Sequence, residues 1–290
     1  MSDRESTGAK SAIVTGGAKG IGRAISEKLA ASGFHLWLAG RDAAALGEAA
    51  AQIRQRHAVD VRTVAVDLGE PGGAETLLAP FKSPAELPHA MILGAADYGV
   101  LGPLVDVDFA AWKRSFDLNF FSVAEAIQRY LKLALKGPTV PRRRIVVMGG
   151  AGLGGVQVAG AISSYSCAKA ALYRLVEVVH EETNARGIDI NCVLPGLVAT
   201  GMVDKAIAAG PMLGAIYEAS LKTKTTGGTP PETAADFIAT LLGDGCTGIS
   251  GRLFSARWDQ SALASPAAVI ADGDLFRLRR IDNALFGRHK

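Results

Sequence analysis

The sequence predicts an α/β fold of one domain, in which a doubly wound parallel sheet has helices on both faces. Three observations support this prediction. Short apolar runs alternate with longer helical patterns along most of the 290 residues. The apolar runs are nearly continuous, as expected for parallel strands that are buried on both faces. A glycine-rich turn joins the first apolar run to the first helical pattern, as in a βαβ unit.

The first half of the chain contains four predicted strands and two predicted helices. Runs of β-branched and aliphatic residues between turn residues indicate the strands, and apolar residues at helical spacing indicate the helices. The strands span residues 11–15, 34–39, 61–66 and 90–93, and the helices span residues 21–32 and 43–56. A turn-rich region around Pro84 and Pro88 precedes the fourth strand.

The second half continues the same alternation. A long helical pattern stops before Gly137 and Pro138, which are residues that end helices. Gly187 follows the next long helix in the position of a C-cap. The predicted helices here span residues 109–135, 164–186 and 231–242, and the strands span residues 144–148, 188–194 and 252–255.

No linker-like change in composition divides the chain. We therefore expect one domain over residues 11–258, after a flexible segment over 1–10 and before a C-terminal extension over 259–290. Residues 274–281 of the extension have apolar side chains at helical spacing. They predict a helix that either packs on its own domain or covers a pocket or a neighbouring subunit.

Composition and charge exclude several classes of function. A net charge of +3 and short basic clusters argue against nucleic-acid binding. The three cysteines and five histidines have no disulfide framework or metal-ligand spacing, so we expect no metal and a cytoplasmic location. Residues 145–168 carry no charge and are long enough to cross a bilayer, but glycines interrupt them. They predict a buried strand, a loop and a helix start, and we expect no membrane partner.

The glycine-rich turn has the sequence TGGAKGIG and follows the first strand. Gly16, Gly20 and Gly22 let the backbone turn sharply and approach a pyrophosphate, and the helix that follows offers free N–H groups at its positive end. A purely structural turn is the alternative. Because the turn lies between a strand and a helix near the start of the chain, it favours a dinucleotide-binding fold of the Rossmann type.

The end of the second predicted strand indicates which dinucleotide is bound. A carboxylate there holds the 2′-hydroxyl of NAD, whereas this chain has Gly40, Arg41 and Asp42. Arg41 and Lys19 are two cations that can contact a 2′-phosphate, so the sequence favours NADP (NADPH) over NAD. The alternative is that Asp42 points inward and holds a ribose, with Arg41 on the surface.

Tyr165 and Lys169 form the predicted catalytic pair. They are four residues apart, so they share one face of the predicted helix. A nearby ammonium favours the phenolate, so we expect Lys169 to lower the pKa of Tyr165 and to let it exchange a proton with a carbonyl or hydroxyl group. The alternative is an ordinary pair on a helix surface.

Together these motifs resemble those of the short-chain dehydrogenase/reductase family, over about residues 10–258. The resemblance rests on TGGAKGIG, Asp67, Asn119, Tyr165 with Lys169, and Pro195-Gly196 with Thr200. It implies that Tyr165 is the acid/base and that Lys169 holds the nicotinamide ribose and tunes the tyrosine. It also implies that Asn119 supports a water-linked proton path through Lys169.

The resemblance further implies a set of cofactor contacts. Asp67 contacts the adenine, and the segment after the sixth strand frames the nicotinamide. The residues expected to bind the cofactor are Gly16, Lys19, Gly20, Ile21, Gly22, Arg41, Asp67, Leu68, Gly94, Tyr165, Lys169, Pro195, Gly196, Val198 and Thr200.

The chain departs from the family pattern at two places. The family usually has a serine after the fifth strand, where this chain has Gly149 and Gly150. Ser163 or Ser164 can replace that hydroxyl, although N-caps of the helix are the favoured interpretation, and a hydroxyl on the substrate is another alternative. The family's Asn-Asn-Ala-Gly is here LGAA, from residue 93 to residue 96. We expect the loss of the asparagine hydrogen bonds to cost some stability.

The substrate side is predicted less sharply. Residues 197–229 are expected to cover the substrate, either as a hinged glycine-containing loop or as an amphipathic helix packed on the domain. Residues 154–156 (Gly154, Gly155 and Val156) are expected to form the opposite wall of the pocket. The family resemblance implies a homodimer or homotetramer built from the long helices near 109–135 and 164–186.

These features predict an NADPH-dependent carbonyl reductase or alcohol dehydrogenase, in which hydride reaches a ketone or aldehyde and Tyr165 delivers the proton. One alternative is an NADP-binding protein of impaired activity with a sensing or scaffolding role, indicated by the absent serine. A second alternative is an isomerase or dehydratase that regenerates its cofactor. The substrate and the physiological direction stay open.

Overall fold

Seven parallel strands form one sheet in the order β3-β2-β1-β4-β5-β6-β7. The computed structural model describes residues 10–139, 142–150, 160–264, 270 and 275–278. The strands are β1 (Ser11–Thr15), β2 (His35–Gly40), β3 (Val61–Ala65), β4 (Ala90–Leu93), β5 (Arg143–Met148), β6 (Ile188–Leu194) and β7 (Arg252–Ser255). Strands β1 to β3 are added toward one edge of the sheet, and β4 to β7 are added toward the other edge. The order of the strands therefore reverses between β1 and β4, and α/β sheets bind ligands at this place.

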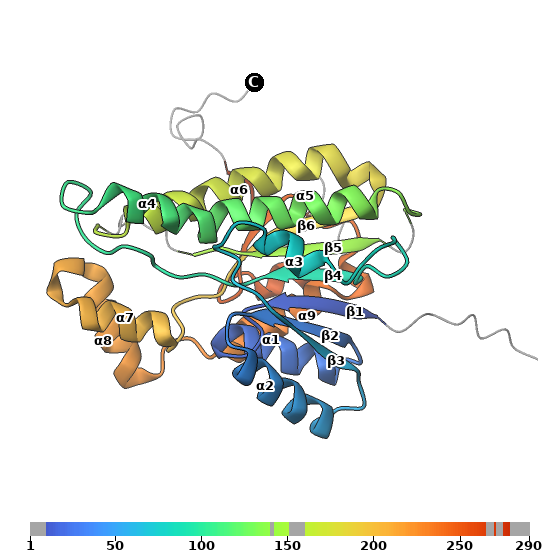
Figure 1. Cartoon of the computed structure of the whole chain (residues 1–290), viewed down its shortest axis with the longest axis horizontal. Coiled ribbons are helices and arrows are strands. Elements are labelled where there is room, and N and C mark those ends of the chain that lie inside the picture. Colours follow the sequence, from blue (N-terminus) through green and yellow to red (C-terminus); the bar gives the residue numbers. More distant parts are fainter. Residues whose placement is uncertain (1–9, 140–141, 151–159, 265–269, 271–274, 279–290) are drawn as a thin grey trace, which may run out of the picture.

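Helices cover both faces of the sheet (Figure 1). One face is covered by α1 (Gly20–Ala31), α2 (Ala43–Arg56) and α9 (Pro231–Leu241). The other is covered by α3 (Gly73–Leu78), α5 (Ser122–Ala134) and α6 (Ser163–Thr183). Short helical turns lie at η2 (Asn184–Arg186), η4 (Asp244–Cys246) and η5 (Gln260–Ala264). The fold class predicted from the sequence, a single Rossmann-type domain, is confirmed.

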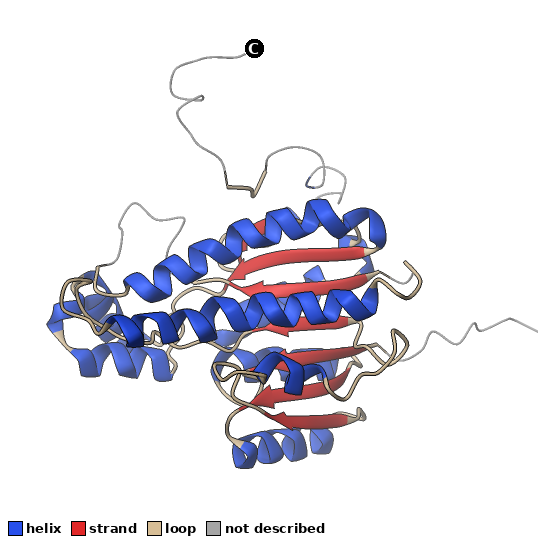
Figure 2. Cartoon of the chain, turned by 45° about the horizontal axis from the view of Figure 1, so that its top comes forward, coloured by secondary structure: helices blue, strands red, loops and turns tan. Residues whose placement is uncertain are grey.

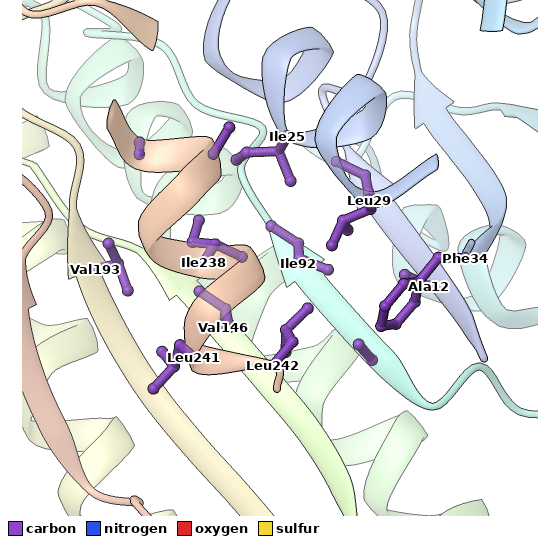
Figure 3. Packing of buried hydrophobic residues seen from close by; sticks show 14 of the residues in the cluster. Ala12, Ile25, Leu29, Phe34, Ile92, Val146, Val193, Ile238, Leu241 and Leu242 are labelled. Atoms are coloured by element: carbon purple, nitrogen blue, oxygen red, sulfur yellow. The ribbon is translucent and has the colours of Figure 1, made fainter. Parts of the chain in front are cut away.

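Alternate side chains along each central strand enter the two apolar layers. In β1, Val14 joins the layer under α1 and α9, whereas Ile13 joins the layer under α5 and α6. Figure 3 shows the first layer, where Ile25 of α1 and Ile238 of α9 lie near Ile92 of β4. Burying one such aliphatic side chain contributes about 1.5–3 kcal/mol, so this two-sided core holds the strand ends in fixed positions.

The strand arrowheads in Figure 2 all point toward the end of the molecule where α7 and α8 lie. These helices, α7 (Gly201–Ala209) and α8 (Ala215–Thr226), are joined by the short turn η3 (Pro211–Leu213). We call residues 201–226 the α7–α8 segment. The expectation for this part of the chain was open between a hinged loop and a helix, and the structure shows two helices. The sequence prediction did not identify α3, α7 or α8.

The helix predicted over 109–135 is present without a break, but it contains a π-helical turn that the sequence did not predict. The structure has α4 (Phe109–Phe116), a π-helical turn η1 (Asp117–Phe121) and then α5. Asn119 lies in the π turn and is fully buried, with hydrogen bonds to the segment after β4. A π turn fits an extra residue into a helix and recurs at functional sites.

The described part of the C-terminal extension packs on its own domain. Leu253 N donates a hydrogen bond to Phe276 O at 2.7 Å, and the Phe276 ring lies 4.9 Å from that of Phe254. Leu278 N donates to Glu177 Oε1 of α6 at 2.8 Å. Residues 275–278 form a turn, so the helix predicted over 274–281 is not present at the described positions. Residues 1–9, from the segment expected to be flexible, lie outside the described residues.

No helix among the described residues is both long enough and apolar enough to span a membrane. The uncharged stretch over 145–168 contributes most of β5 and the first turns of α6 to the buried domain, as predicted. Residues 151–159 within that stretch lie outside the described residues.

Candidate active site

Two adjoining cavities lie at the carboxyl ends of the strands. The inner cavity has a volume of about 420 Å³, and the outer cavity has a volume of about 540 Å³. They share Ile21, Gly22, Gly94 and Thr200 among their lining residues. Every residue that the sequence analysis assigned to the cofactor lines one cavity or both. The inner cavity contains the predicted nicotinamide end, and the outer cavity contains the predicted adenosine end.

The glycine turn lies where the two cavities meet: Gly22 lines both, and Gly16 and Gly20 line the outer cavity. Gly16 has a φ of +71°, and a Cβ on Gly22 would overlap the carbonyl oxygen of Gly16, so a side chain at position 22 does not fit. Helix α1 begins at Gly20, and its N-cap residue Lys19 makes no side-chain capping hydrogen bond. Its first N–H groups therefore remain available to an anion, and the close backbone approach suits a pyrophosphate.

Thr15 braces β1 against the segment that follows β4. Its hydroxyl oxygen accepts hydrogen bonds from Gly94 N at 2.9 Å and from Ala95 N at 3.1 Å. Thr15 is fully buried, so these bonds are shielded from water. The bracing between strands that the family's asparagines were expected to supply is thus supplied here by a threonine on the neighbouring strand.

Two ion pairs border the outer cavity. Arg41 Nη1 lies 3.7 Å from Asp67 Oδ2, and Lys19 Nζ lies 2.8 Å from Asp42 Oδ2. Asp42 is also the N-cap of α2, and its Oδ1 accepts a hydrogen bond from Ala45 N at 2.9 Å. This hydrogen bond and the Lys19 ammonium lower the pKa of Asp42. Asp42 therefore serves the helix end and Lys19, and the two cations lie at the same edge of the cavity.

Tyr165 and Lys169 are brought together on α6, as the spacing predicted. Tyr165 is 5% exposed and Lys169 is 1% exposed. Lys169 Nζ lies 5.7 Å from the centre of the Tyr165 ring and donates a hydrogen bond to Met148 O at 3.0 Å. Both residues line the inner cavity.

The expected lowering of the Tyr165 pKa is wrong in this structure. Burial raises the pKa of Tyr165, and the nearby Tyr98 and Tyr173 phenols raise it further. Burial also lowers the pKa of Lys169 to about 8, because the ammonium loses its hydration. Burial therefore acts in the same sense on both groups and favours the neutral phenol.

Gly150 stands directly against the tyrosine hydroxyl. A Cβ on Gly150 would overlap Tyr165 Oη and would lie 2.8 Å from Tyr165 Cζ. The Tyr173 hydroxyl donates to Gly150 O at 2.6 Å and accepts from Gly150 N at 3.2 Å, which fixes the glycine backbone. The position that usually bears a serine is thus closed to a side chain.

Neither proposed substitute for the serine reaches the cavity. The Ser163 hydroxyl oxygen accepts a hydrogen bond from Trp112 Nε1 at 3.0 Å. Ser164 Oγ is buried and has no hydrogen-bond partner among the described residues. The N-cap of α6 is Ile162, without a side-chain capping bond, so the prediction of a serine cap is also wrong. Neither serine lines the inner cavity.

Tyr98 is a cavity residue that the sequence analysis missed. It is 6% exposed, and its ring centre lies 5.1 Å from that of Tyr165 in an edge-to-face arrangement. Both tyrosines line the inner cavity with Gly150. The signal was present in the sequence, because Tyr98 comes shortly after Leu93, where β4 ends and ligands bind in such sheets.

Asn119 connects the π turn to the loop that bears Tyr98. Its Nδ2 donates to Asp97 O at 2.8 Å and to Ser115 O at 2.9 Å. The Asn119 side chain therefore holds the loop after β4, and no hydrogen bond between Asn119 and Lys169 is present among the described residues. The proton path through Asn119 stays a prediction.

The α7–α8 segment closes over the tyrosines. Ala206 and Leu213 belong to one buried apolar cluster with Tyr98 and Tyr165. Lys205 of α7 forms an ion pair with Asp97, next to Tyr98. The opposite wall predicted at residues 154–156 lies outside the described residues.

Three comparisons with known proteins agree with this geometry. A family model described as short chain dehydrogenase matches residues 10–209. The chain is 33% identical over 199 residues to L-2,3-butanediol dehydrogenase from Corynebacterium glutamicum, a match that covers 67% of this chain and 73% of that enzyme.

Solved structures resemble the fold closely. The Pseudomonas aeruginosa RhlG/NADP active-site complex matches with a TM-score of 0.73 and 23% identity, over 88% of this chain and 97% of that chain. The angucycline C-6 ketoreductase LanV with bound NADP matches with a TM-score of 0.70 and 25% identity, over 85% of this chain and 93% of that chain.

Proposed function

Because the chain belongs to the short-chain dehydrogenase family, we propose that this oxidoreductase is an NADPH-dependent carbonyl reductase in which Tyr165 delivers the proton. One observation supports the proposal most strongly. Tyr165 lines a cavity that adjoins the groove over the glycine turn, and the two share Ile21, Gly22, Gly94 and Thr200. The proposed proton donor and the predicted nicotinamide site therefore line the same cavity.

The residues around the groove fit NADP. Gly16, Gly20 and Gly22 hold the pyrophosphate against the start of α1, and Arg41 and Lys19 contact the 2′-phosphate. The cofactor supplies the hydride when it is bound. Two solved structures that resemble this one contain NADP, which supports the same choice of cofactor.

The raised pKa of Tyr165 suits the residue to act as the acid that reduction needs at neutral pH. Because burial raises the pKa of Tyr165, the phenol retains its proton and acts as a general acid toward the oxygen of a carbonyl group. Oxidation of an alcohol needs the phenolate, which forms only at higher pH. Lys169, buried beside Tyr165, holds the ribose and orients the site.

The proposal is tested by measuring NADPH oxidation with diacetyl, acetophenone, menadione and fructose. We expect the chain to reduce at least one of these probes. Tyr165→Phe should lower kcat by about 10²- to 10⁴-fold, the usual contribution of a positioned acid, while the Kd for NADPH stays within twofold. Tyr217→Phe is the matched control, because Tyr217 packs at the edge of the same apolar cluster but does not line the inner cavity. Undiminished turnover in Tyr165→Phe would remove this tyrosine from the mechanism.

A second candidate function is NADP binding without turnover, as in a sensor or scaffold. The observation that favours it is Gly150, which leaves the reacting oxygen without the usual serine hydroxyl. Tight NADPH binding by fluorescence, with no oxidation by any probe, would support this candidate. An isomerase or dehydratase would instead convert its substrate with no net change in NADPH absorbance, and chromatography of the products would distinguish it.

We also propose a homo-oligomer that uses α4 and the neighbouring π turn. Phe109 is 61% exposed and Phe121 is 57% exposed, so both aromatic rings are available to a second copy of the chain. Light scattering should show a dimer or tetramer, and Phe121→Asp should shift the mass toward the monomer. A wild-type monomer at micromolar concentration would contradict the proposal.

A further inference from the structure

Gly150 leaves a gap in the expected set of hydrogen-bond donors around the reacting oxygen. A carbonyl that accepts a hydride develops negative charge on its oxygen, and a second preorganised donor typically contributes about 10²- to 10³-fold in rate. Tyr165 is one donor. The structure must supply the second from another element if the chain is an efficient reductase.

We propose that the Tyr98 hydroxyl is this second donor and binds the reacting oxygen of the substrate together with Tyr165. The proposal rests on the proposed reductase function. Tyr98 and Tyr165 line the same cavity, and their rings meet edge to face at 5.1 Å. The two phenols come from different elements, one from the loop after β4 and the other from α6.

The hydrogen bonds of the buried tyrosines support this assignment. The Tyr130 hydroxyl donates to Pro88 O at 2.6 Å, and the Tyr173 hydroxyl donates to Gly150 O at 2.6 Å. The Tyr98 and Tyr165 hydroxyls make no hydrogen bond to any described residue. A phenol hydroxyl usually has a partner, so two tyrosines that line one cavity and whose hydroxyls lack a partner among the described residues point to an oxygen of a ligand.

The loop that bears Tyr98 is held in place by two side chains of the helix that packs against it. Ser115 Oγ donates a hydrogen bond to Tyr98 O at 3.4 Å, and Asn119 Nδ2 donates to Asp97 O at 2.8 Å. A Cβ on Gly99 would overlap the Ser115 hydroxyl, so the loop packs directly against α4. A donor on a fixed loop costs little to reorganise when charge develops on the substrate.

The two phenols differ in what happens to their protons. Tyr165 loses its proton to the substrate oxygen as the carbonyl becomes an alcohol. Tyr98 keeps its proton throughout and only donates a hydrogen bond. Burial raises the pKa of Tyr98, so its hydroxyl remains a donor at neutral and mildly alkaline pH.

Tyr98→Phe tests the proposal, because it removes one oxygen and keeps the ring that packs against Tyr165. With the best carbonyl probe from the panel, we expect kcat to fall about 10²- to 10³-fold, whereas KM for NADPH and the melting temperature stay close to wild type. The pH profile should keep its shape, since Tyr165 remains the acid. Tyr217→Phe should retain wild-type kcat and controls for the loss of a phenol near the cluster.

The outcomes separate the two proposals. A Tyr98→Phe variant with wild-type kcat would overturn the role of Tyr98 and leave the reductase function standing. A fall in kcat that comes with an equal loss of NADPH affinity or of melting temperature would assign Tyr98 a structural role and would also overturn the proposal. A wild-type chain that binds NADPH and reduces no probe would overturn both.

Discussion

The Tyr165 hydroxyl fills the space into which a side chain on Gly150 would project, with Tyr165 Cζ 2.8 Å from an ideal Cβ on the glycine. Glycine at position 150 therefore both removes a hydrogen-bond donor and makes room for the Tyr165 hydroxyl. The backbone just after β5 comes so close to the phenol that restoring a side chain requires the phenol to move.

Gly150→Ser, which restores the residue usual in the family, should lower turnover rather than raise it. The added atoms displace Tyr165 Oη, and a misplacement of about 1 Å at a reacting group costs on the order of 10²-fold in rate. The measurement is kcat for NADPH oxidation. Gly160→Ser is the control, since nothing lies within 4 Å of an added Cβ there. A gain in kcat for Gly150→Ser would contradict this prediction, because it would show that Tyr165 can shift to accommodate the serine without loss of activity.

Arg41→Ala should weaken NADPH binding about 10- to 100-fold and leave the weaker NADH binding nearly unchanged, because charge-assisted hydrogen bonds contribute about 1.5–3 kcal/mol. The two Kd values are measured by titrating cofactor fluorescence. Arg114→Ala is the matched control, because the Arg41 and Arg114 side chains are each 68% exposed, and Arg114 pairs with Asp108 on α4. Equal losses for NADPH and NADH would indicate that Arg41 does not contact the 2′-phosphate.

Lys169→Met should remove the part of the pH dependence of the free energy of unfolding that arises from the titration of Lys169. Burial lowers the pKa of Lys169 from its ordinary 10.5 to about 8, so between these values the unfolded chain binds more protons than the folded chain. The contribution of Lys169 to the free energy of unfolding therefore rises with pH across this window. The free energy of the variant minus that of the wild type should fall by on the order of 3 kcal/mol from pH 7.5 to pH 10.5.

Urea unfolding at several pH values measures that difference. The phenols and thiols whose pKa values burial raises lose stability at alkaline pH in both proteins, so the subtraction removes their contribution. Lys222→Met, at an exposed position of α8, controls for the loss of one positive charge. A difference that stays constant with pH would mean that Lys169 is not desolvated as the structure indicates.

Thr15→Val should destabilise the fold by about 1–3 kcal/mol, because the shape is kept while Gly94 N and Ala95 N lose their acceptor in a buried site. Urea unfolding at neutral pH gives the value. Thr63→Val changes the same atoms at an exposed position of β3 and should have a small effect. If both variants unfold alike, Thr15 is not the brace between β1 and β4.

Periodicity predicted the parallel sheet, and the two cavities lie at the strand ends where the sequence analysis expected a ligand. The strands at Ser11–Thr15, Ala90–Leu93, Ile188–Leu194 and Arg252–Ser255 begin and end where the sequence indicated, because each is an apolar run between turn residues. The π turn at Asp117–Phe121 was not predicted, since one extra residue in a helix leaves no local signal. The α7–α8 segment was not predicted as two helices because Gly201, Gly210 and Gly214 interrupt its apolar residues.

The candidate site was predicted where a local motif defines it and missed where the fold brings distant residues together. The positions of Tyr165, Lys169 and the glycine turn follow from spacing alone. The pKa of Tyr165 depends on burial in an apolar cluster that includes Ala206 and Leu213, which are far away in sequence, and so its direction was predicted wrongly. The contact of Tyr98 with Tyr165 is likewise tertiary.

Two kinds of contact hold the α7–α8 segment to the domain, and they respond differently to ionic strength. Salt screens the Lys205–Asp97 ion pair, in which the side chains are 39% and 35% exposed, but does not weaken the apolar contact of Leu213 with the tyrosines. Raising sodium chloride from low to high concentration should therefore increase KM for the carbonyl substrate by up to about fivefold, the usual limit for an exposed pair.

Lys205→Met should show the raised KM already at low salt and lose most of the salt dependence. Lys224→Met is the control, because Lys224 pairs with Asp204 inside the α7–α8 segment and does not fasten it to the domain. A salt response that survives in Lys205→Met would assign it elsewhere. Ionic strength therefore controls in part how readily a substrate reaches the two phenols. The chain is expected to bind its substrate more tightly at low salt than at high salt.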